Sequence, residues 1–391
     1  MVPRVLPIRY AGRAGALFKL ALKTGLFTLL TLGFYRFWAR TRLRRYYWSA
    51  IRPGGIPLEY VGDPIEKLLG FLVAVVFMAF YIGVVNLILM YFSFALFQGN
   101  GIAYVLSFLG LAPIIFFAQY RARRYILART RWRGIRFGLE PGAGGYVWRS
   151  IVHYVVAILS VGLSWPLTTL WLEKYRVNRT YYGDLQFVQG GKRTLLFGAM
   201  RHIYYALGLS AVAGGMLALS ENPAWAALFL LTVPWAIYGW AYWRAESFKR
   251  MTETKELGEI RFRTKPRPGR IIGIYLLGGL VLNLVLYGVL ILAVVLVILA
   301  LGGTGGFDFD PEQIAQLGTA ATPAFVAIYF LGFVMIGAAT QALFTLPMTR
   351  HFAEVTQVID PSALNRIQQR DRDEFAEAEG FADALDVGAA I

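Results

Sequence analysis

Long apolar blocks dominate the pattern of hydrophobic and polar positions along this chain. Six of them cover residues 68–97, 101–118, 195–220, 223–241, 271–301 and 323–346. Each reaches or approaches the roughly 20 residues that an α-helix needs to cross a hydrocarbon layer of about 30 Å. The pattern predicts an α-helical multi-span membrane protein with six full spans, arranged as three hairpins.

Two further apolar segments, 14–38 and 147–172, have basic residues on both flanks, which argues against an ordinary crossing. Each is interrupted near its middle, at Gly33 in the first and at Gly162 and Pro166 in the second. We interpret both as broken re-entrant or interfacial helices. Eight full spans are the alternative.

Four short segments alternate between apolar and polar positions, as strands with one buried face do. Each begins with a glycine, and the four segments are 55–60, 134–139, 183–187 and 258–262. We expect four short cytoplasmic strands that form a small sheet. Four unrelated loop segments are the alternative, because each alternation is brief.

The spacing of these segments indicates a tandem internal duplication. Tyr60 and Phe187 are 127 residues apart, and Phe137 and Phe262 are 125 residues apart. The predicted organisation is a first repeat at 1–145 with its span hairpin at 68–118, and a second repeat at 146–269 with its hairpin at 195–241. A third hairpin at 270–346, with an acidic outer loop, and an acidic cytoplasmic tail at 347–391 follow.

The chain is strongly basic, with 39 Lys and Arg against 23 Asp and Glu and a net charge of +16. The outer loops between the paired spans contain no Lys or Arg, so the positive-inside rule places both termini on the cytoplasmic side of the membrane. The expected partner is the bilayer, with anionic phospholipid, and not nucleic acid. A homo-oligomer or another membrane-protein partner is left open.

Arginines lie among aromatic residues where apolar blocks end, and arginine binds phosphate with a forked geometry. Two interpretations are open for these positions: specific binding of lipid headgroups, or simple anchors that set the topology. The candidate headgroup-binding residues are Arg42, Arg44, Arg45, Arg121, Arg123, Arg124, Arg176 and Arg179.

Few polar residues interrupt the expected spans, and no Asp or Glu does. Asn86, Arg201, His202 and Asn283 are therefore candidates for a transport pathway, or for hydrogen bonds between helices. No catalytic motif is present, the three histidines are far apart in the sequence, and there is no cysteine. We expect no enzyme activity, no cofactor and no metal site.

Three segments resemble the signatures of the YjgN family of bacterial inner-membrane proteins. They are LTLGFYRFWARTRLRRYYW, TRWRGIRFGLEPG and NRTYYGDLQFVQGG, in that order. The resemblance implies a multi-span inner-membrane protein. It implies no activity, substrate or catalytic residue.

These observations predict a transporter, channel or lipid-handling factor. The alternative is a membrane scaffold or assembly factor that binds anionic lipid or another membrane protein. A polar cavity lined by Asn86 or Arg201 would favour transport. The acidic tail adds a hypothesis, in which its carboxylates lie over the basic cytoplasmic face and compete with lipid headgroups.

Overall fold

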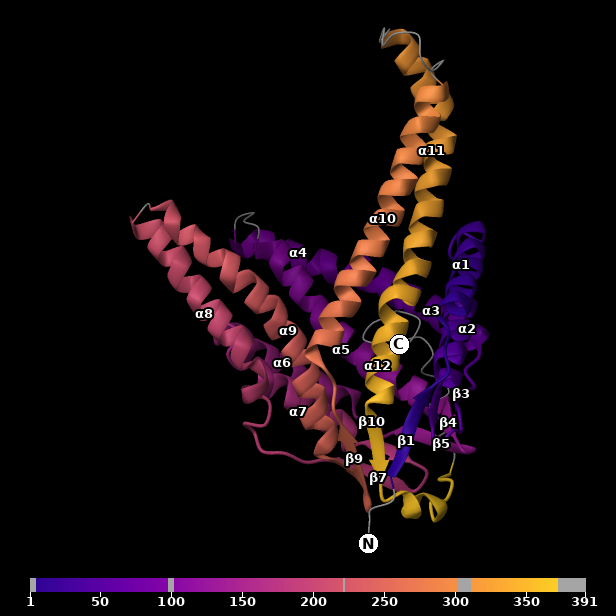
Figure 1. The fold of residues 1–391 in the computed structure, drawn as a ribbon, viewed down its shortest axis with the longest axis vertical. Coiled ribbons are helices and arrows are strands. Elements are labelled where there is room, and N and C mark those ends of the chain that lie inside the picture. The colour runs from indigo at the N-terminus through magenta and orange to yellow at the C-terminus, as the bar shows by residue number, and fades with distance from the viewer. Residues whose placement is uncertain (1–4, 98–101, 221, 301–310, 372–391) are drawn as a thin grey trace. The chain divides into compact units, whose positions relative to one another are not determined.

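The computed structural model describes residues 5–97, 102–220, 222–300 and 311–371 (Figure 1). The chain forms two compact units, each built from separated stretches of sequence. The sheet unit is Met1–Ala11, Tyr47–Gly269 and Phe352–Ile391. The helical unit is Gly12–Tyr46 and Arg270–His351. We describe each unit by itself.

A single antiparallel sheet of ten strands forms the centre of the sheet unit. The strands are β1 (Val5–Tyr10), β2 (Ile51–Pro53), β3 (Leu58–Tyr60), β4 (Thr130–Trp132), β5 (Ile135–Leu139), β6 (Thr180–Tyr182), β7 (Leu185–Gln189), β8 (Lys255–Leu257), β9 (Ile260–Thr264) and β10 (Thr356–Ile359). Their order is β2-β1-β10-β9-β8-β7-β6-β5-β4-β3. A short loop, 54–57, joins the two outermost strands, so the sheet curls into a nearly closed barrel.

Helices lead directly into the strands. α2 (Arg36–Ala50), α5 (Ile102–Ala128), α7 (Trp165–Val177), α9 (Leu228–Glu253) and α12 (Leu346–Glu354) end one to three residues before β2, β4, β6, β8 and β10. Three of the strands that follow a helix continue into a tight hairpin. Arg133 and Gly134 both have positive φ in the two-residue turn between β4 and β5, the conformation that matches the twist of paired strands.

Apolar side chains from alternate strand positions fill the interior of the sheet. Trp132, Tyr182, Leu257, Ile260 and Val358 are buried there. Residues after β10 close this core, because Leu364 of the short helix Pro361–Asn365 and Ile367, which follows that helix, pack into the same cluster. The segment that leads to the tail is therefore part of the folded sheet unit.

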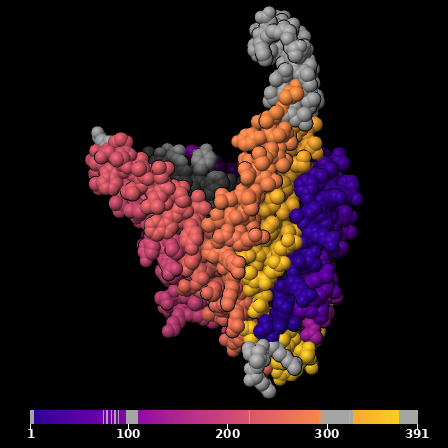
Figure 2. All heavy atoms as spheres, viewed as in Figure 1, coloured from indigo at the N-terminus to yellow at the C-terminus, as the bar shows by residue number. Residues whose placement is uncertain are grey.

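The remaining helices of the sheet unit are α3 (Pro64–Phe80), α4 (Asn86–Phe97), α6 (Ala143–Leu159) and α8 (Phe197–Ser220), with a 3-10 turn at Pro223–Ala227 before α9. α8 and α9 pack side by side as a hairpin (Figure 1). Ala199, Ala206 and Ala213 are buried along α8, and Gly239 of α9 lies against the backbone of Ile203. Small residues allow this close approach, and side chains fill the space between the two helices (Figure 2).

The helical unit contains α1 (Ala14–Leu30), most of α10 (Pro268–Ala300), α11 (Pro311–Thr340) and a π-helical stretch at Gln341–Thr345. α1 packs on α11 where Gly25 meets Val334. Gly278 of α10 lies against Leu343 and Phe344 in the same way. Close packing at glycine again brings the helix backbones together.

The prediction of six full spans and four strands is wrong. Within the described ranges, four helical segments are long and apolar enough to cross a membrane: Phe197–Ser220, Pro223–Glu253, Pro268–Ile291 and Val326–Glu354. The block 68–97 instead forms α3 and α4 around a π-helical turn, and the block 101–118 continues within α5 into a series of arginines. An apolar block in the sequence is therefore not always one apolar helix. The alternative of eight spans is wrong for the same reason.

The four predicted strand segments do form strands, β3, β5, β7 and β9, but they are fewer than half of the sheet. Six strands were missed. β1 and β10 lie near the two ends of the chain, outside the repeated pattern, and β2, β4, β6 and β8 have three residues each and directly follow helices. Three residues are too few for an alternating pattern to be recognised. The tertiary pairing of neighbouring hairpins defines these strands.

Both predicted helix breaks are present in the structure. Leu32 and Gly33 separate α1 from α2, and Val161 and Gly162 separate α6 from α7, all with positive φ. Leu32 is 92% exposed and Val161 is 90% exposed. Each break therefore presents apolar side chains outward, which is unusual for a surface in contact with water.

Candidate functional site

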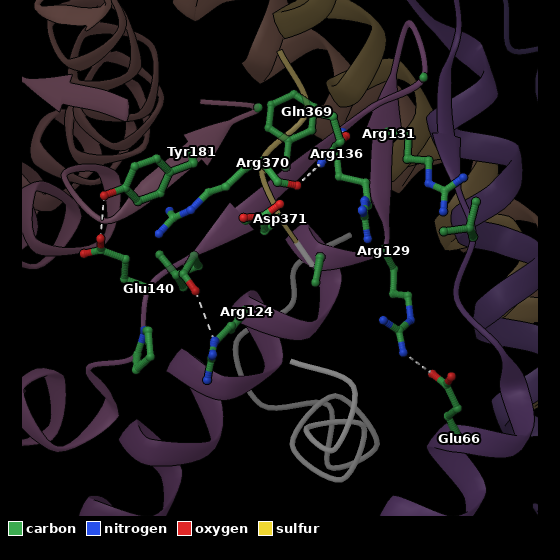
Figure 3. A pocket seen from close by; sticks show the side chains of 18 residues that line it. Glu66, Arg124, Arg129, Arg131, Arg136, Glu140, Tyr181, Gln369, Arg370 and Asp371 are labelled. Carbon is green, nitrogen blue, oxygen red and sulfur yellow. Dashed lines mark hydrogen bonds and ion pairs between the residues drawn. The ribbon is translucent and has the colours of Figure 1, made fainter. Parts of the chain in front are cut away.

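A large cavity lies where the end of α5 meets the outer face of β4 and β5, in the sheet unit (Figure 3). Its volume is about 870 Å³. Charged side chains dominate its lining, which we call the arginine pocket. The arginines are Arg124, Arg129, Arg131, Arg136 and Arg370, and the acids are Glu66, Glu140 and Asp371.

Strand alternation explains why two of these arginines face the pocket. Trp132 and Ile135 pack into the core of the sheet, so their neighbours Arg131 and Arg136 lie on the other face. These two arginines are direct partners in the register of β4 and β5. Like charges directly opposite each other destabilise a sheet, by up to about 1 kcal/mol. A bound anion would remove that cost.

Arg131 also has an acidic neighbour in register, Glu59 on β3, but no ion pair joins these two residues in the described part of the chain. The Nε of Arg131 is buried and has no hydrogen-bond partner there. Because arginine stays protonated in proteins, this donor is charged and unsatisfied. An anionic ligand in the pocket would satisfy it.

Two of the pocket's acids already bind residues of the same pocket wall. Arg129 forms an ion pair with Glu66 at 2.8 Å, and the Tyr125 hydroxyl donates to the same carboxylate at 3.0 Å. Burial, followed by the proximity of Tyr60 and Glu66, raises the pKa of Tyr125 well above its ordinary value. Tyr125 therefore remains a protonated donor that holds Glu66 against the wall.

Glu140 is held in a comparable way at the other end of the pocket. The Tyr181 hydroxyl donates to Glu140 at 2.5 Å, and burial together with this bond raises the pKa of Tyr181. Arg124 donates from its Nε to the backbone oxygen of Leu139 at 3.0 Å. The pocket thus contains more arginines than acids, and two of its three acids, Glu66 and Glu140, already bind other side chains of the protein.

The predicted headgroup-binding arginines do not act as one group. Arg124 lines the pocket, whereas its sequence neighbour Arg123 turns to α7 and forms an ion pair with Glu173 at 3.6 Å. Arg176 binds the same carboxylate at 2.8 Å. Arg179 lies over the Tyr175 ring at 3.8 Å. Most of these side chains therefore bind other groups within the protein.

The acid between Arg123 and Arg176 is strongly stabilised in its charged form. Burial raises the pKa of Glu173, but Arg123, Arg176 and Lys255 outweigh burial and lower that pKa to about 2. We call these four residues the Glu173 cluster. It is a structural ion cluster that ties α5 and α7 to the start of β8.

The other candidate arginines lie elsewhere. Arg121 is one turn before Arg124 on α5, with its guanidinium 5.3 Å from the centre of the Phe117 ring. Arg42, Arg44 and Arg45 belong to the helical unit, on α2. Arg42 lies over the Tyr35 ring at 5.6 Å, and Arg44 is buried.

The predicted pathway residues do not line the arginine pocket. Arg201 donates to the Tyr242 hydroxyl at 3.0 Å, and His202 accepts from the Trp235 indole at 3.3 Å, so both join α8 to α9. Asn283 donates to Gly279 within its own helix at 2.8 Å. The side chain of Asn86 lies outside the described residues.

Sequence reasoning missed Arg129, Arg131, Arg136 and Arg370 as site residues. A signal was present, because R-T-R-W-R-G-I-R combines alternating arginines with a turn glycine. Once the turn is placed at Arg133 and Gly134, Arg131 and Arg136 must lie opposite each other. Arg370 is brought to the pocket only by the tertiary fold.

In the described part of the chain, no group of three or more His, Asp or Glu side chains is placed so that it could hold a metal ion. In a comparison with protein families, the profile described as "Bacterial protein of unknown function (DUF898)" matches residues 5–384. No curated protein and no solved structure matches this chain.

Proposed function

We propose that this chain, which belongs to the DUF898 or YjgN family, is a non-enzymatic lipid-handling protein of the bacterial inner membrane. In this proposal the arginine pocket binds a phosphate-bearing anion, presented as the headgroup of an anionic phospholipid. The single observation that carries the proposal is the pair Arg131 and Arg136, two like charges opposite each other in a cavity with an excess of arginines.

The chemistry of the pocket suits phosphate. Guanidinium groups form paired, charge-assisted hydrogen bonds to phosphate oxygens. The buried, unsatisfied Nε of Arg131 supplies one such donor. Arg136 adds a second positive charge on the adjacent strand. A ligand that bridges the two would replace repulsion by attraction.

The position of the pocket on α5 suits a headgroup. The apolar part of this helix ends at Phe117 and Ala118, and its first arginine is Arg121. Arg124 follows one turn later, ~5 Å further along the helix axis. Four apolar helical segments are compatible with a membrane location. The charge distribution supports a cytoplasmic location for both termini and for the pocket.

Lipid handling is preferred to transport because of where the polar span residues lie. Arg201 and His202 bind aromatic residues of α9, and Asn283 bonds to its own helix. The pocket is lined instead by helix ends and strands. These placements support a binding site at the headgroup level rather than a polar route through the spans.

Calorimetric titration of the detergent-solubilised protein would test the proposal, with dihexanoyl phosphatidylglycerol, dihexanoyl phosphatidylcholine and inorganic phosphate as probes. We expect phosphatidylglycerol to bind and phosphatidylcholine not to bind. The variant R131Q/R136Q should lose about 30-fold in affinity for phosphatidylglycerol, as expected for two hydrogen bonds with net contributions of about 1 kcal/mol each.

The matched control is R261Q/R263Q, which removes the same charge from β9. There Arg261 faces Glu256 in register and forms an ion pair with it at 3.2 Å. The proposal fails if both double variants bind phosphatidylglycerol equally, or if the neutral lipid binds as well as the anionic one. If inorganic phosphate binds with the same affinity as phosphatidylglycerol, the ligand of the pocket is the free anion and not a lipid headgroup.

A further inference from the structure

The turn that joins α6 to α7 is strained, apolar and exposed. Val161 and Gly162 both have positive φ, at 51° and 82°. This conformation suits glycine and asparagine, and it is an outlier for a β-branched residue such as valine. Val161 is also 90% exposed, so packing against the described residues does not explain why an apolar side chain lies there. An apolar environment outside the protein would explain it.

The same turn occurs between α1 and α2, in the helical unit. Leu32 and Gly33 have φ of 51° and 96°, and Leu32 is exposed like Val161. In both turns a hydroxyl, of Thr31 or of Ser160, accepts a hydrogen bond from the backbone N–H four residues later, at 2.9 and 3.0 Å. An exposed apolar residue at the strained position is therefore a repeated feature of this chain.

The apolar part of the α6–α7 hairpin, residues 143–177, has the length of one membrane leaflet. No Lys, Arg, Asp or Glu lies between Arg149 and Glu173. The uncharged parts of α6 and α7 are about 15 Å and ~12 Å long, roughly half of the ~30 Å hydrocarbon core. The hairpin is therefore long enough to enter a bilayer and too short to cross it. Large apolar side chains are exposed along both helices near the turn: Val155, Val156, Ile158, Leu159, Leu163 and Trp165.

Cation–aromatic pairs lie at the base of this hairpin. The Arg149 guanidinium lies 4.7 Å from the centre of the Tyr175 ring. The Lys174 ammonium lies 5.8 Å from the centre of the Trp171 ring. Trp148, the neighbour of Arg149 in the sequence, is exposed. Basic and aromatic side chains concentrate at the headgroup boundary of membranes, so the base of the hairpin suits headgroups and its turn suits acyl chains.

A hydrogen bond places the turn beside a membrane-capable helix. The Tyr204 hydroxyl of α8 donates to the backbone oxygen of Leu163 at 2.8 Å. The helix α8 (Phe197–Ser220) is long and apolar enough to cross a membrane. Tyr204 lies ~10 Å along the helix axis from the first residue of α8 and ~24 Å from the last. The turn is therefore near the end of α8 that follows β7, within one leaflet of a bilayer that α8 crosses.

We propose that the α6–α7 hairpin inserts its apolar turn into the acyl chains of one membrane leaflet and returns to the same side. Acyl chains cover Val161 and its exposed apolar neighbours, and this burial offsets the strain at the turn. The hairpin begins at the wall of the arginine pocket, because Glu140 and Pro141 line the pocket and α6 starts at Ala143. Insertion holds the pocket near the headgroups, but it requires no ligand and does not rest on the proposed function.

Fluorescence quenching measures the depth of the turn, because the chain has no cysteine of its own and a single label can be attached. V161C and, in a second protein, L159C carry a nitrobenzoxadiazole fluorophore in phosphatidylcholine vesicles. Nitroxide lipids carry the quencher either in the headgroup or in the acyl chain. We expect acyl-chain nitroxides to quench both labels more strongly than the headgroup nitroxide does. The control K192C, at an exposed residue before α8, should be quenched by no acyl-chain nitroxide.

A membrane-impermeant maleimide, added to one side of sealed vesicles and then to the other, tests whether the hairpin crosses. We expect V161C to be unreactive from both sides, whereas K192C reacts from the side to which the hairpin returns. Reaction of V161C from the same side as K192C would place the turn in water, and reaction from the opposite side would show a crossing. A position 161 that neither reacts nor is quenched is covered by protein, such as a second copy. Each of these three results overturns the proposal.

The apolar character of the turn is tested with the L159C label in two backgrounds. V161N/L163N removes two exposed apolar side chains, and asparagine tolerates positive φ, so the turn itself is retained. V161I/L163I is the matched control that keeps the apolar surface. We expect acyl-chain quenching of the label to be lost in the first background and kept in the second. Equal quenching in the two would contradict insertion through the turn.

Failure of this proposal and failure of the proposed function are distinguishable, because these vesicles are neutral and contain no anionic ligand. If acyl-chain nitroxides quench the labels but phosphatidylglycerol does not bind in the titration, the proposed function fails and the inserted hairpin stands. If phosphatidylglycerol binds but V161C reacts with maleimide in water, the insertion fails and the function stands.

Discussion

Arg123 and Arg124 are adjacent on α5, yet they belong to two differently built basic regions. Successive helix positions point about 100° apart, so Arg123 reaches Glu173 of α7 and Arg124 reaches the pocket wall at Leu139. In the Glu173 cluster, three cations surround one carboxylate. In the arginine pocket, the arginines outnumber the acids around an open cavity of about 870 Å³.

The difference shows that the number of arginines says little about their role. A carboxylate within reach converts arginines into a structural clamp, and its absence leaves their charge available for a ligand. Removal of Glu173 should therefore weaken the fold, whereas removal of pocket arginines should weaken binding.

The largest effect is expected from Glu173→Gln. The amide cannot balance Arg123, Arg176 and Lys255, so the free energy of unfolding should fall by about 3 kcal/mol, as for other buried ion pairs that lose one partner. Thermal unfolding of the solubilised protein measures it. The control is Glu256→Gln, whose carboxylate is 43% exposed and should contribute less than ~1 kcal/mol. Equal losses in the two variants would contradict a structural role for the cluster.

A smaller effect is expected from R131Q/R136Q. It should lower the affinity for phosphatidylglycerol by about 30-fold, equivalent to ~2 kcal/mol. The free energy of unfolding should rise by about 0.5 kcal/mol, because the repulsion across β4 and β5 is relieved. Titration and thermal unfolding on the same samples measure both quantities. A clear loss of stability would show that these arginines serve the fold and not a ligand.

The pH dependence of stability gives a third test. Because Arg123, Arg176 and Lys255 outweigh burial and lower the pKa of Glu173 to about 2, the folded state keeps the carboxylate charged after the unfolded chain has bound a proton. Stability from Glu173 is therefore complete above its ordinary pKa and is lost as the pH falls toward 2. Between pH 4 and pH 3 we expect a loss of about 1 kcal/mol relative to Glu173→Gln. Parallel unfolding curves for the two proteins in this window would contradict the low pKa.

The smallest effect is expected from Glu66→Gln. Its carboxylate is 38% exposed, so loss of the ion pair with Arg129 should cost only about 0.5 kcal/mol of stability. The change removes one negative charge from the pocket wall and should raise the affinity for phosphatidylglycerol about threefold. Titration in low salt measures this change. A fall in affinity would show that Glu66 itself contacts the ligand.

Local sequence determined several features of this protein. The apolar content is compatible with a membrane location, as are four apolar helical segments in the described ranges, and the family resemblance is confirmed by the match over residues 5–384. Both helix breaks occur at the expected glycines, since Gly33 and Gly162 adopt positive φ, which other residues disfavour. The strands β5, β7 and β9 were recognisable because five residues suffice to show an alternating pattern.

The tertiary structure alone decided the nearly closed sheet, the number of membrane-capable helices in the described ranges and the site. Strands of three residues are defined by their partners in the sheet. Whether an arginine forms an ion pair depends on which acids other helices and strands bring near it, as Arg123 and Arg124 show. Periodicity is a local property of the chain, whereas charge compensation is set by contacts between residues far apart in sequence. The arginine pocket, which joins Arg131 to Arg370, therefore exists only in the folded chain.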